Sequence, residues 1–348
     1  MLKRISFFLL PTILFFASCG DKKVPDVSDI KVDLTLNRFD KDFFAIDTNN
    51  TAASLKELAK KYPVFLPEFT KDIMGLPPLS DSSLQAFEVI KQFIRDYKPI
   101  KDTSDHIFAS FDAIKKDIEK GLQFTKHYFP AYRLPEKINT FIGPMDAYFE
   151  ASLGIYGDAI TNDGLAVGLQ LHLGSNSSFY TSPMGEALYP RYLSRRFMPE
   201  NVAVNCIKNI IDDIYPINLR SKSMVEQMVE KGKKLYVLDK LMPYTADSLK
   251  IGYTDKQLKG CYANEGGIWN FFLTNNLLFN KEPDILKNYM SDGPNTQELG
   301  ASSPGYIGLF VGWQIVKKYM EKNEKMTLIQ LLQTDAKKVF DESKYRPK

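Results

Sequence analysis

Two stretches of the chain gather side chains that could do chemistry, and the first is Tyr189–Glu200. Here Arg191, Arg195 and Arg196 are interleaved with aromatic residues and prolines. Guanidinium groups near aromatic rings recognise carboxylates, phosphates and sugars, so Arg195 and Arg196 are candidate ligand-binding residues. The same arginines could equally pair with internal acids and fix a loop. We favour this structural interpretation.

The second stretch is Gly260–Phe272, where Glu265 is followed by Gly266 and Gly267 inside an otherwise helical pattern. Glycine in a helix interior costs about 1 kcal/mol relative to alanine, so the pair needs a reason. Close helix packing is one reason. A functional Glu265 carboxylate at a narrow site is the other.

Familiar catalytic and cofactor motifs are missing from the sequence. His106, His127 and His172 are scattered, and none lies four residues from another as on a zinc-binding helix, so each is expected to be a surface or packing residue. The chain has no Gly-x-Ser-x-Gly nucleophile elbow, phosphate loop or dinucleotide fingerprint. Asp212 and Asp213 are adjacent, but neighbours on a helix point about 100° apart, which favours a solvated surface. We expect no cofactor.

The N-terminal residues predict where the protein is located. Lys3 and Arg4 precede an apolar stretch over 5–16, and residues 16–19 read Phe-Ala-Ser-Cys. This pattern is typical of a secretory signal peptide over residues 1–18, too short for a membrane-spanning helix. The segment resembles a bacterial lipobox, which implies cleavage before Cys19, a thioether lipid on Cys19 and an acylated (for example palmitoylated) N-terminus. Several acyl chains anchor a protein stably. An ordinary signal peptide with a chance cysteine is the alternative.

The composition is that of an ordinary globular protein, with 44% hydrophobic and 25% charged residues. Cleavage before Cys19 removes two basic residues and lowers the net charge from +3 to +1, which gives no electrostatic reason to bind nucleic acid. Residues 19–32 are polar and lack a helical period, so they are expected to be a lipidated tether, and residues 33–348 a single globular domain. Cys206 and Cys261 could form a disulfide in an oxidising compartment or remain buried thiols.

The hydrophobic pattern predicts a mainly helical α+β fold with a small antiparallel sheet packed on helices. Helical spacing recurs over Phe87–Tyr97, Ile107–Ile118, Val225–Met242, Ile307–Tyr319 and Leu328–Val339. Strands are expected at 32–36, Ile138–Ile142, Phe149–Ile160 and Leu165–Leu173, with a turn at residues 162–164. Ser303-Pro304 is expected to open one helix and Thr327 to cap the last.

Taken together, these segments resemble the gliding-motility lipoprotein family GldB of the Bacteroidota. The resemblance is carried in order by the lipobox, Val32-Asp33-Leu34, Arg38-Phe39-Asp40, Phe43-Phe44, Leu169–Gly174, Tyr189–Glu200, Glu265-Gly-Gly and Ser303–Val316. It implies a role in gliding and in the associated type IX secretion machinery. The resemblance by itself does not indicate a molecular activity.

That family is in turn similar to a group of zinc peptidases with a gluzincin-like core. In those proteins an edge strand precedes a His-Glu-x-x-His helix, and a later glutamate supplies the third metal ligand. Laid over this chain, the strand falls on Leu165–Leu173 and the metal helix on Val202–Ile211. The resemblance therefore implies a degenerate gluzincin-like peptidase core.

At the motif positions both histidines would be replaced, by Asn205 and Asn209. Cys206 would stand where the catalytic glutamate belongs, and Glu265 could take the third-ligand position. Asparagine amides are poor zinc ligands beside imidazole or thiolate, and activation of water would lack its carboxylate. The resemblance thus implies a vestigial site at Asn205, Cys206, Asn209 and Glu265, with no metal.

We therefore expect a non-catalytic envelope lipoprotein, a pseudoenzyme that acts as scaffold or binding partner for other motility and secretion proteins. The former cleft, lined by Arg195, Arg196, Glu265 and Trp313, could still bind a peptide or glycan. A metallopeptidase-like hydrolase and a cell-wall or peptide-binding module are the alternatives. Gly20 follows Cys19, so a common signal for inner-membrane retention is missing, and we expect the periplasmic side of the outer membrane.

Overall fold

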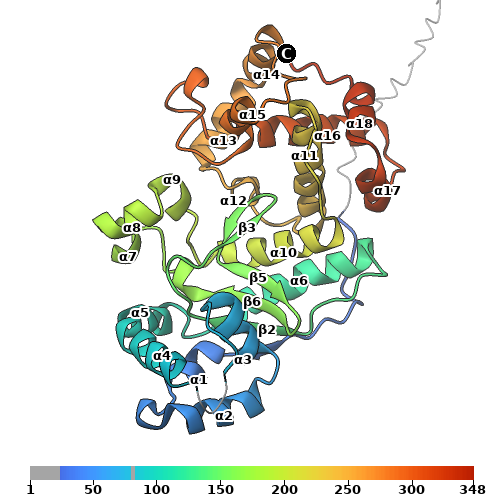
Figure 1. The fold of residues 1–348 in the computed structure, drawn as a ribbon. Coiled ribbons are helices and arrows are strands. Elements are labelled where there is room, and N and C mark those ends of the chain that lie inside the picture. The colour runs from blue at the N-terminus through green and yellow to red at the C-terminus, as the bar shows by residue number, and fades with distance from the viewer. Residues whose placement is uncertain (1–23, 80–82) are drawn as a thin grey trace, which may run out of the picture.

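The computed structural model describes residues 24–79 and 83–348 (Figure 1). The predicted signal peptide, Cys19 and the first part of the tether lie outside these residues. Val27 is only 1% exposed and belongs to the hydrophobic core, so the described end of the predicted tether packs on the domain. None of the helices within the described ranges is both long enough and apolar enough to span a membrane.

The first half of the chain is built around a four-stranded sheet. Its strands are β1 (Thr35–Asn37), β2 (Lys137–Phe141), β6 (Gly164–Gly168) and β5 (Asp158–Thr161), in that spatial order. β2 pairs in parallel with both β1 and β6, and only β5 and β6 are antiparallel. The mainly helical α+β class is confirmed, but the sheet is mixed and not antiparallel. Parallel pairing requires long connections, and a whole helical segment separates β1 from β2.

The predicted strands agree with the structure except at their ends. The segment Phe149–Ile160 forms a hairpin of β3 (Phe149–Ala151) and β4 (Gly154–Tyr156), followed by β5. The strand expected over Leu165–Leu173 ends at Gly168, and Leu169–Leu171 form a short 3-10 helix, η3. Gly168 allows this close turn, because a Cβ there would lie 2.4 Å from the carbonyl oxygen of Gly157.

Helices cover both faces of the sheet (Figure 1). The helices before β2 are α1 (Phe39–Phe44), η1 (Thr48–Asn50), α2 (Thr51–Lys61), α3 (Phe65–Glu68), η2 (Phe69–Ile73), α4 (Leu84–Asp96), α5 (Lys98–Ile107) and α6 (Asp112–Tyr128). After the sheet come α7 (Ser178–Thr181), α8 (Pro183–Leu188), α9 (Arg191–Ser194) and α10 (Asn201–Ile214). α1 to α5 lie on one side of the sheet, and α6 and α10 lie on the other.

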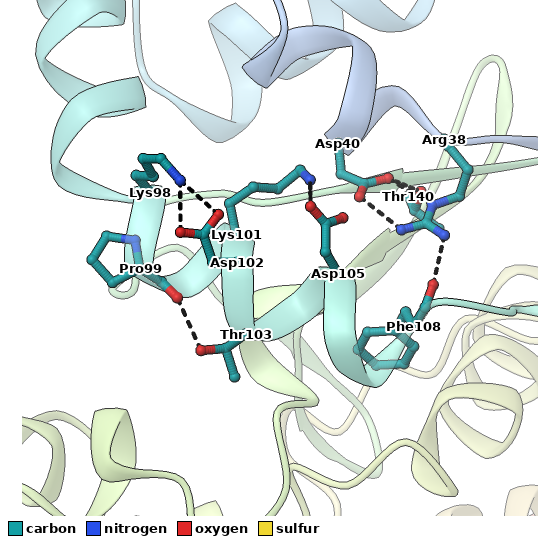
Figure 2. A network of polar contacts seen from close by, with 10 residues as sticks. All are labelled: Arg38, Asp40, Lys98, Pro99, Lys101, Asp102, Thr103, Asp105, Phe108 and Thr140. Carbon is teal, nitrogen blue, oxygen red and sulfur yellow. Dashed lines mark hydrogen bonds and ion pairs between the residues drawn. The ribbon is translucent and has the colours of Figure 1, made fainter.

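The Arg38-Phe39-Asp40 motif joins α1 to the sheet. Arg38 donates two hydrogen bonds to the Asp40 carboxylate, both 2.9 Å, and one of 2.7 Å to the carbonyl oxygen of Phe108 (Figure 2). The hydroxyl of Thr140 on β2 donates to Asp40 at 2.5 Å. Phe39 is fully buried among other aromatic rings. The contacts of this motif therefore stabilise the fold.

The second half of the chain is helical. Its elements are α11 (Met224–Leu241), α12 (Asp247–Ile251), α13 (Asp255–Ala263), α14 (Glu265–Thr274), α15 (Pro283–Met290), η4 (Gln297–Leu299), α16 (Ile307–Lys322), α17 (Leu328–Gln333) and α18 (Ala336–Ser343). α11 and α16 approach closely at Gly232 and Gly312, since a Cβ on Gly312 would lie 1.8 Å from the carbonyl oxygen of Met228. Most residues of both helices are buried.

Several predicted helix ends need correction. Thr327 caps α17 with a capping box, as expected, but the predicted last helix is divided into α17 and α18. The helix expected to open at Ser303-Pro304 begins only at Ile307, after Tyr306 in a left-handed conformation with φ of 59°. The Ser303 hydroxyl instead bonds the backbone of Thr296, which holds this loop in place of a helix turn.

Candidate functional site

The two asparagines of the predicted vestigial motif lie one turn apart on α10 and face the sheet. The side-chain amide of Asn205 donates to Oδ2 of Asp158 at 3.0 Å, and that of Asn209 donates to the backbone oxygen of Asp158 at 2.7 Å. Asp158 is the first residue of β5 and is fully buried. Both asparagines therefore hold α10 on the edge of the sheet.

The same carboxylate binds His172, which the sequence suggested only as a packing residue. Nε2 of His172 lies 3.0 and 2.9 Å from the two oxygens of Asp158, and its Nδ1 lies 3.2 Å from the backbone oxygen of Met198. Both ring nitrogens of His172 therefore face oxygen acceptors. The amide of Gly168 adds a further donor to Asp158 at 3.2 Å. Asp158 is thus a fully bonded junction between β5, the end of η3 and α10.

Cys206 and Cys261 are both free and buried. Burial, with a smaller contribution from Asp158, raises the pKa of the Cys206 thiol well above its usual range. Burial also raises the pKa of Cys261 to about 12. Of the two alternatives, the structure has separate buried thiols, and neither is poised to act as a thiolate nucleophile.

Glu265 lies elsewhere. It is the first residue of α14, and its carboxylate accepts a 2.6 Å hydrogen bond from the hydroxyl of Tyr345 in the C-terminal segment. Gly266 allows that segment to approach, because a Cβ there would lie 2.6 Å from the backbone oxygen of Lys348. α14 and α10 are well separated (Figure 1). The structure therefore does not bring Glu265 to Asn205 and Asn209, and close packing accounts for the first glycine of the pair.

Trp313 does not line an open cleft. It is fully buried in α16, where its indole N–H donates to Asp239 at 2.7 Å and the ammonium of Lys317 lies 3.3 Å from the ring centroid. The expectation of a ligand site that includes Trp313 is therefore wrong, because the helix faces the core on this side.

The arginine-rich segment is used inside the molecule, as the structural interpretation expected. Arg195 donates to Oε1 of Gln257 and to the backbone oxygen of Gly252, both at 3.0 Å. Arg196 forms an ion pair of 2.9 Å with Asp292. These contacts join the segment after α9 to α12, α13 and the loop after α15.

Around Arg196 lies a group of charges that we call the basic cluster: Arg195, Arg196, Lys208, Lys231, Lys234, Asp212 and Asp292. Lys208 on α10 is only 4% exposed. It has no hydrogen bond or ion pair to any described residue, and its ammonium lies 5.1 Å from the ring centroid of Tyr156. Burial, reinforced by the Arg196 charge, lowers the pKa of Lys208 to about 7.

Lys231 on α11 is a second lysine of the basic cluster whose pKa is lowered. Its ammonium donates to the backbone oxygen of Met290 at 3.3 Å and to the hydroxyl of Tyr306. Burial lowers the pKa of Lys231 to about 8, and the nearby Asp292 and Asp212 oppose that shift. Lys231 is also without an acidic partner within the described part of the chain.

The acids of the cluster are already paired. Asp212 accepts from the backbone amide of Ser152 at 3.0 Å, from the Ser152 hydroxyl, and from Lys234 at 2.5 Å. Its neighbour Asp213 turns away and accepts from the hydroxyl of Tyr132 at 2.6 Å. The two carboxylates diverge. Asp213 is exposed, as expected for a solvated helix surface, whereas Asp212 is half-buried and binds internal partners.

Sequence reasoning missed Lys208 and Lys231. The available signal for Lys208 was a lysine inside the apolar run Val202–Ile211, where a charged residue has no reason to be buried without a function or a partner. Lys231 carried no such signal, because α11 contains several lysines. Its neighbours Tyr306 and Met290 are distant in the sequence.

The structure defines a mainly helical α+β protein whose arginine segment and motif asparagines are bound internally. No group of three or more His, Cys, Asp and Glu side chains within residues 24–79 and 83–348 is placed to hold a metal ion. The family model described as gliding motility protein GldB matches residues 20–347. The chain therefore belongs to the GldB family of gliding-motility lipoproteins. No curated protein and no solved structure matches it. The resemblance to gluzincin-like peptidases is not confirmed and stays a prediction.

Proposed function

We propose that this protein is a non-catalytic, lipid-anchored component of the cell envelope that supports gliding and the associated type IX secretion machinery as a scaffold or binding partner. The main support for this proposal is the hydrogen bonding of the Asn205 and Asn209 side chains. Both amides are committed to Asp158, and neither has the chemistry of a good zinc ligand. A helix that would bear the catalytic metal in a peptidase here holds the fold together.

The location is part of the same proposal. Membership of a lipoprotein family and the lipobox at Cys19 support attachment to a membrane through acyl chains. The residue after Cys19 is glycine, which favours the periplasmic side of the outer membrane. Its partners would then be other envelope proteins of the motility and secretion machinery.

Complementation of a deletion strain tests this role. Deleting the gene should abolish surface spreading, and the wild-type copy should restore it. Asn209→Ala and Glu265→Gln should also restore it, because a scaffold needs neither side chain for chemistry. Asn205→Ala is less suitable, since it removes a buried hydrogen bond and costs about 1–3 kcal/mol of stability.

The control is the amount of folded protein, measured by immunoblot and by the thermal melting of each purified variant. A folded, normally abundant Asn209→Ala or Glu265→Gln protein that fails to restore spreading would count against a scaffold role. It would point to a chemical function at that residue.

A further inference from the structure

The basic cluster holds more positive charge than its acids can balance. Arg196 is paired with Asp292 and Lys234 with Asp212, at 2.9 and 2.5 Å. Arg195, Lys208 and Lys231 form no ion pair with any described residue. Lys208 is buried, and Arg195 and Lys231 are half-buried. A cation that is withdrawn from water without a counter-ion is costly, so proteins rarely keep several together unless something compensates for them.

These unpaired groups come from different elements and converge. Lys208 lies on α10, Lys231 on α11 and Arg195 directly after α9. Arg196, Asp212 and Asp292 all act on Lys208 through their charges, and Asp212 and Asp292 also act on Lys231. Ser152 connects the two sides, because it donates to Asp212 and its backbone oxygen accepts a 3.2 Å bond from Tyr306.

Two further observations point to a ligand. The hydroxyl of Tyr156 is buried and has no hydrogen-bond partner in the described structure, although Arg196 lies nearby. Beside it, Gly154 leaves room for one more atom. A Cβ on Gly154 would lie 3.5 Å from Oδ2 of Asp292, 3.6 Å from Nη1 of Arg196 and 3.6 Å from the Tyr156 hydroxyl. The Tyr156 hydroxyl, the Arg196 guanidinium and the Asp292 carboxylate thus all face one point beside Gly154.

We propose that the basic cluster is a binding site for a phosphate group, held by Lys208, Lys231, Arg196 and the hydroxyl of Tyr156. Near neutral pH a phosphate carries between one and two negative charges and offers more acceptor oxygens, so it matches the surplus of cations better than a carboxylate with one charge. Lysine is a common phosphate ligand as a point charge, and arginine and tyrosine supply directed donors. The Arg196–Asp292 pair lies at the outer edge, with side chains 16% and 24% exposed, and marks the route of entry.

This inference does not rest on the scaffold role, and the two can fail independently. The phosphate could be a free ion or the phosphate ester of a lipid headgroup, and the chemistry of recognition is the same. Binding of the anion would also favour the protonated lysines, so affinity should fall as the pH rises above 8. The charged groups that face the lysines are Arg195, Arg196, Lys234, Asp212 and Asp292.

Isothermal titration of the full-length protein in detergent, in a phosphate-free buffer at pH 6.5, tests the proposal. Inorganic phosphate is titrated in one arm, and glycerol 3-phosphate in the other to represent a headgroup ester. Saturable binding in either arm is expected and identifies the source. Lys208→Met and Lys231→Met should each weaken binding about tenfold or more, because each removes a positive charge that would contact the anion. Tyr156→Phe should weaken it less.

Lys287→Met is the matched control, since Lys287 is exposed on α15 and the substitution changes the net charge equally. It should bind phosphate like the wild type. Phosphate stabilises most proteins non-specifically, so a rise in melting temperature would not by itself show specific binding. This non-specific effect should be the same for the wild type and all variants. Absence of saturable binding in both arms would overturn the proposal, as would unchanged binding by folded Lys208→Met and Lys231→Met proteins. Equally tight binding of acetate would also overturn it.

Discussion

At the scale of single residues, Lys208 is the side chain whose position is hardest to explain by folding alone. Its aliphatic part fits an apolar stretch of α10, but its ammonium is buried beside Arg196 without an acid of its own. The folded protein therefore disfavours the charged form, and below the ordinary lysine pKa this opposes folding.

Lys208→Met should accordingly stabilise the protein at neutral and acidic pH. The folded-state pKa of Lys208 is about 7, below the ordinary value of 10.5. Between these values the unfolded chain holds a proton that the folded chain has lost, so wild-type stability rises with pH, at most on the order of 1 kcal/mol per pH unit. The advantage of the variant should be greatest at pH 6.5 and smaller at pH 9.5.

Urea unfolding at both pH values, without phosphate, measures this difference. Lys287→Met should differ from the wild type by the same small amount at each pH. If the advantage of Lys208→Met does not shrink at pH 9.5, the ammonium is not destabilised by burial in the way that the structure indicates.

Some residue roles could be predicted from the sequence and others could not. Arg195 and Arg196 bind internal groups, as the structural interpretation expected, but only Arg196 pairs with an acid. That acid, Asp292, is 96 residues away, beyond the reach of any local pattern. His172 was expected to be a surface or packing residue, and its ring lies in the core. Its bond to Asp158 depends on how β5 pairs with β6, which no spacing rule reveals.

At the scale of elements, the contact between α11 and α16 organises the second half of the chain. The two backbones touch at Gly232 and Gly312, so neither position has room for a Cβ. This close approach lets both helices bury most of their residues, which an amphipathic pattern alone would not suggest.

Gly312→Ala should therefore destabilise the protein severely, by several kcal/mol, or prevent folding, because the new Cβ would overlap the carbonyl of Met228. Gly260→Ala is the matched control. Gly260 lies within α13 with nothing within 4 Å of its missing Cβ, so alanine should stabilise the protein by about 0.5–1 kcal/mol. Urea or thermal unfolding measures both. A Gly312→Ala protein as stable as the wild type would show that the helices can move apart freely.

Most strands and long helices could be predicted because their apolar periods are strong. The helix expected over Ile107–Ile118 is an exception, because α5 ends at Ile107 and α6 begins at Asp112. β2, the hairpin region and the turn before β6 lie where the pattern placed them. The direction of strand pairing was missed, because alternation shows which residues are buried but not which strands are neighbours. The helix start at Ser303-Pro304 was missed because Ser303 bonds Thr296 across the loop, a tertiary contact that overrides the local signal.

At the scale of the whole molecule, the polar side chains that attract attention in the sequence are directed inward. The arginine segment, the motif asparagines and Glu265 each join elements that are distant in the chain. The family and the mainly helical α+β class followed from the order of motifs and the apolar periods. The cleft that the peptidase resemblance implies between α10 and α14 is not formed, because these two helices lie apart (Figure 1).

The metal content of the protein tests the central claim most directly. Full-length protein purified in detergent without chelators should contain far less than one zinc per chain by elemental analysis, while circular dichroism shows that it is folded. This result is expected because Asn205 and Asn209 serve Asp158 and are poor zinc ligands. Close to one zinc per folded chain would contradict a non-catalytic role, and Asp158, His172 and Glu265 would then be the first residues to substitute.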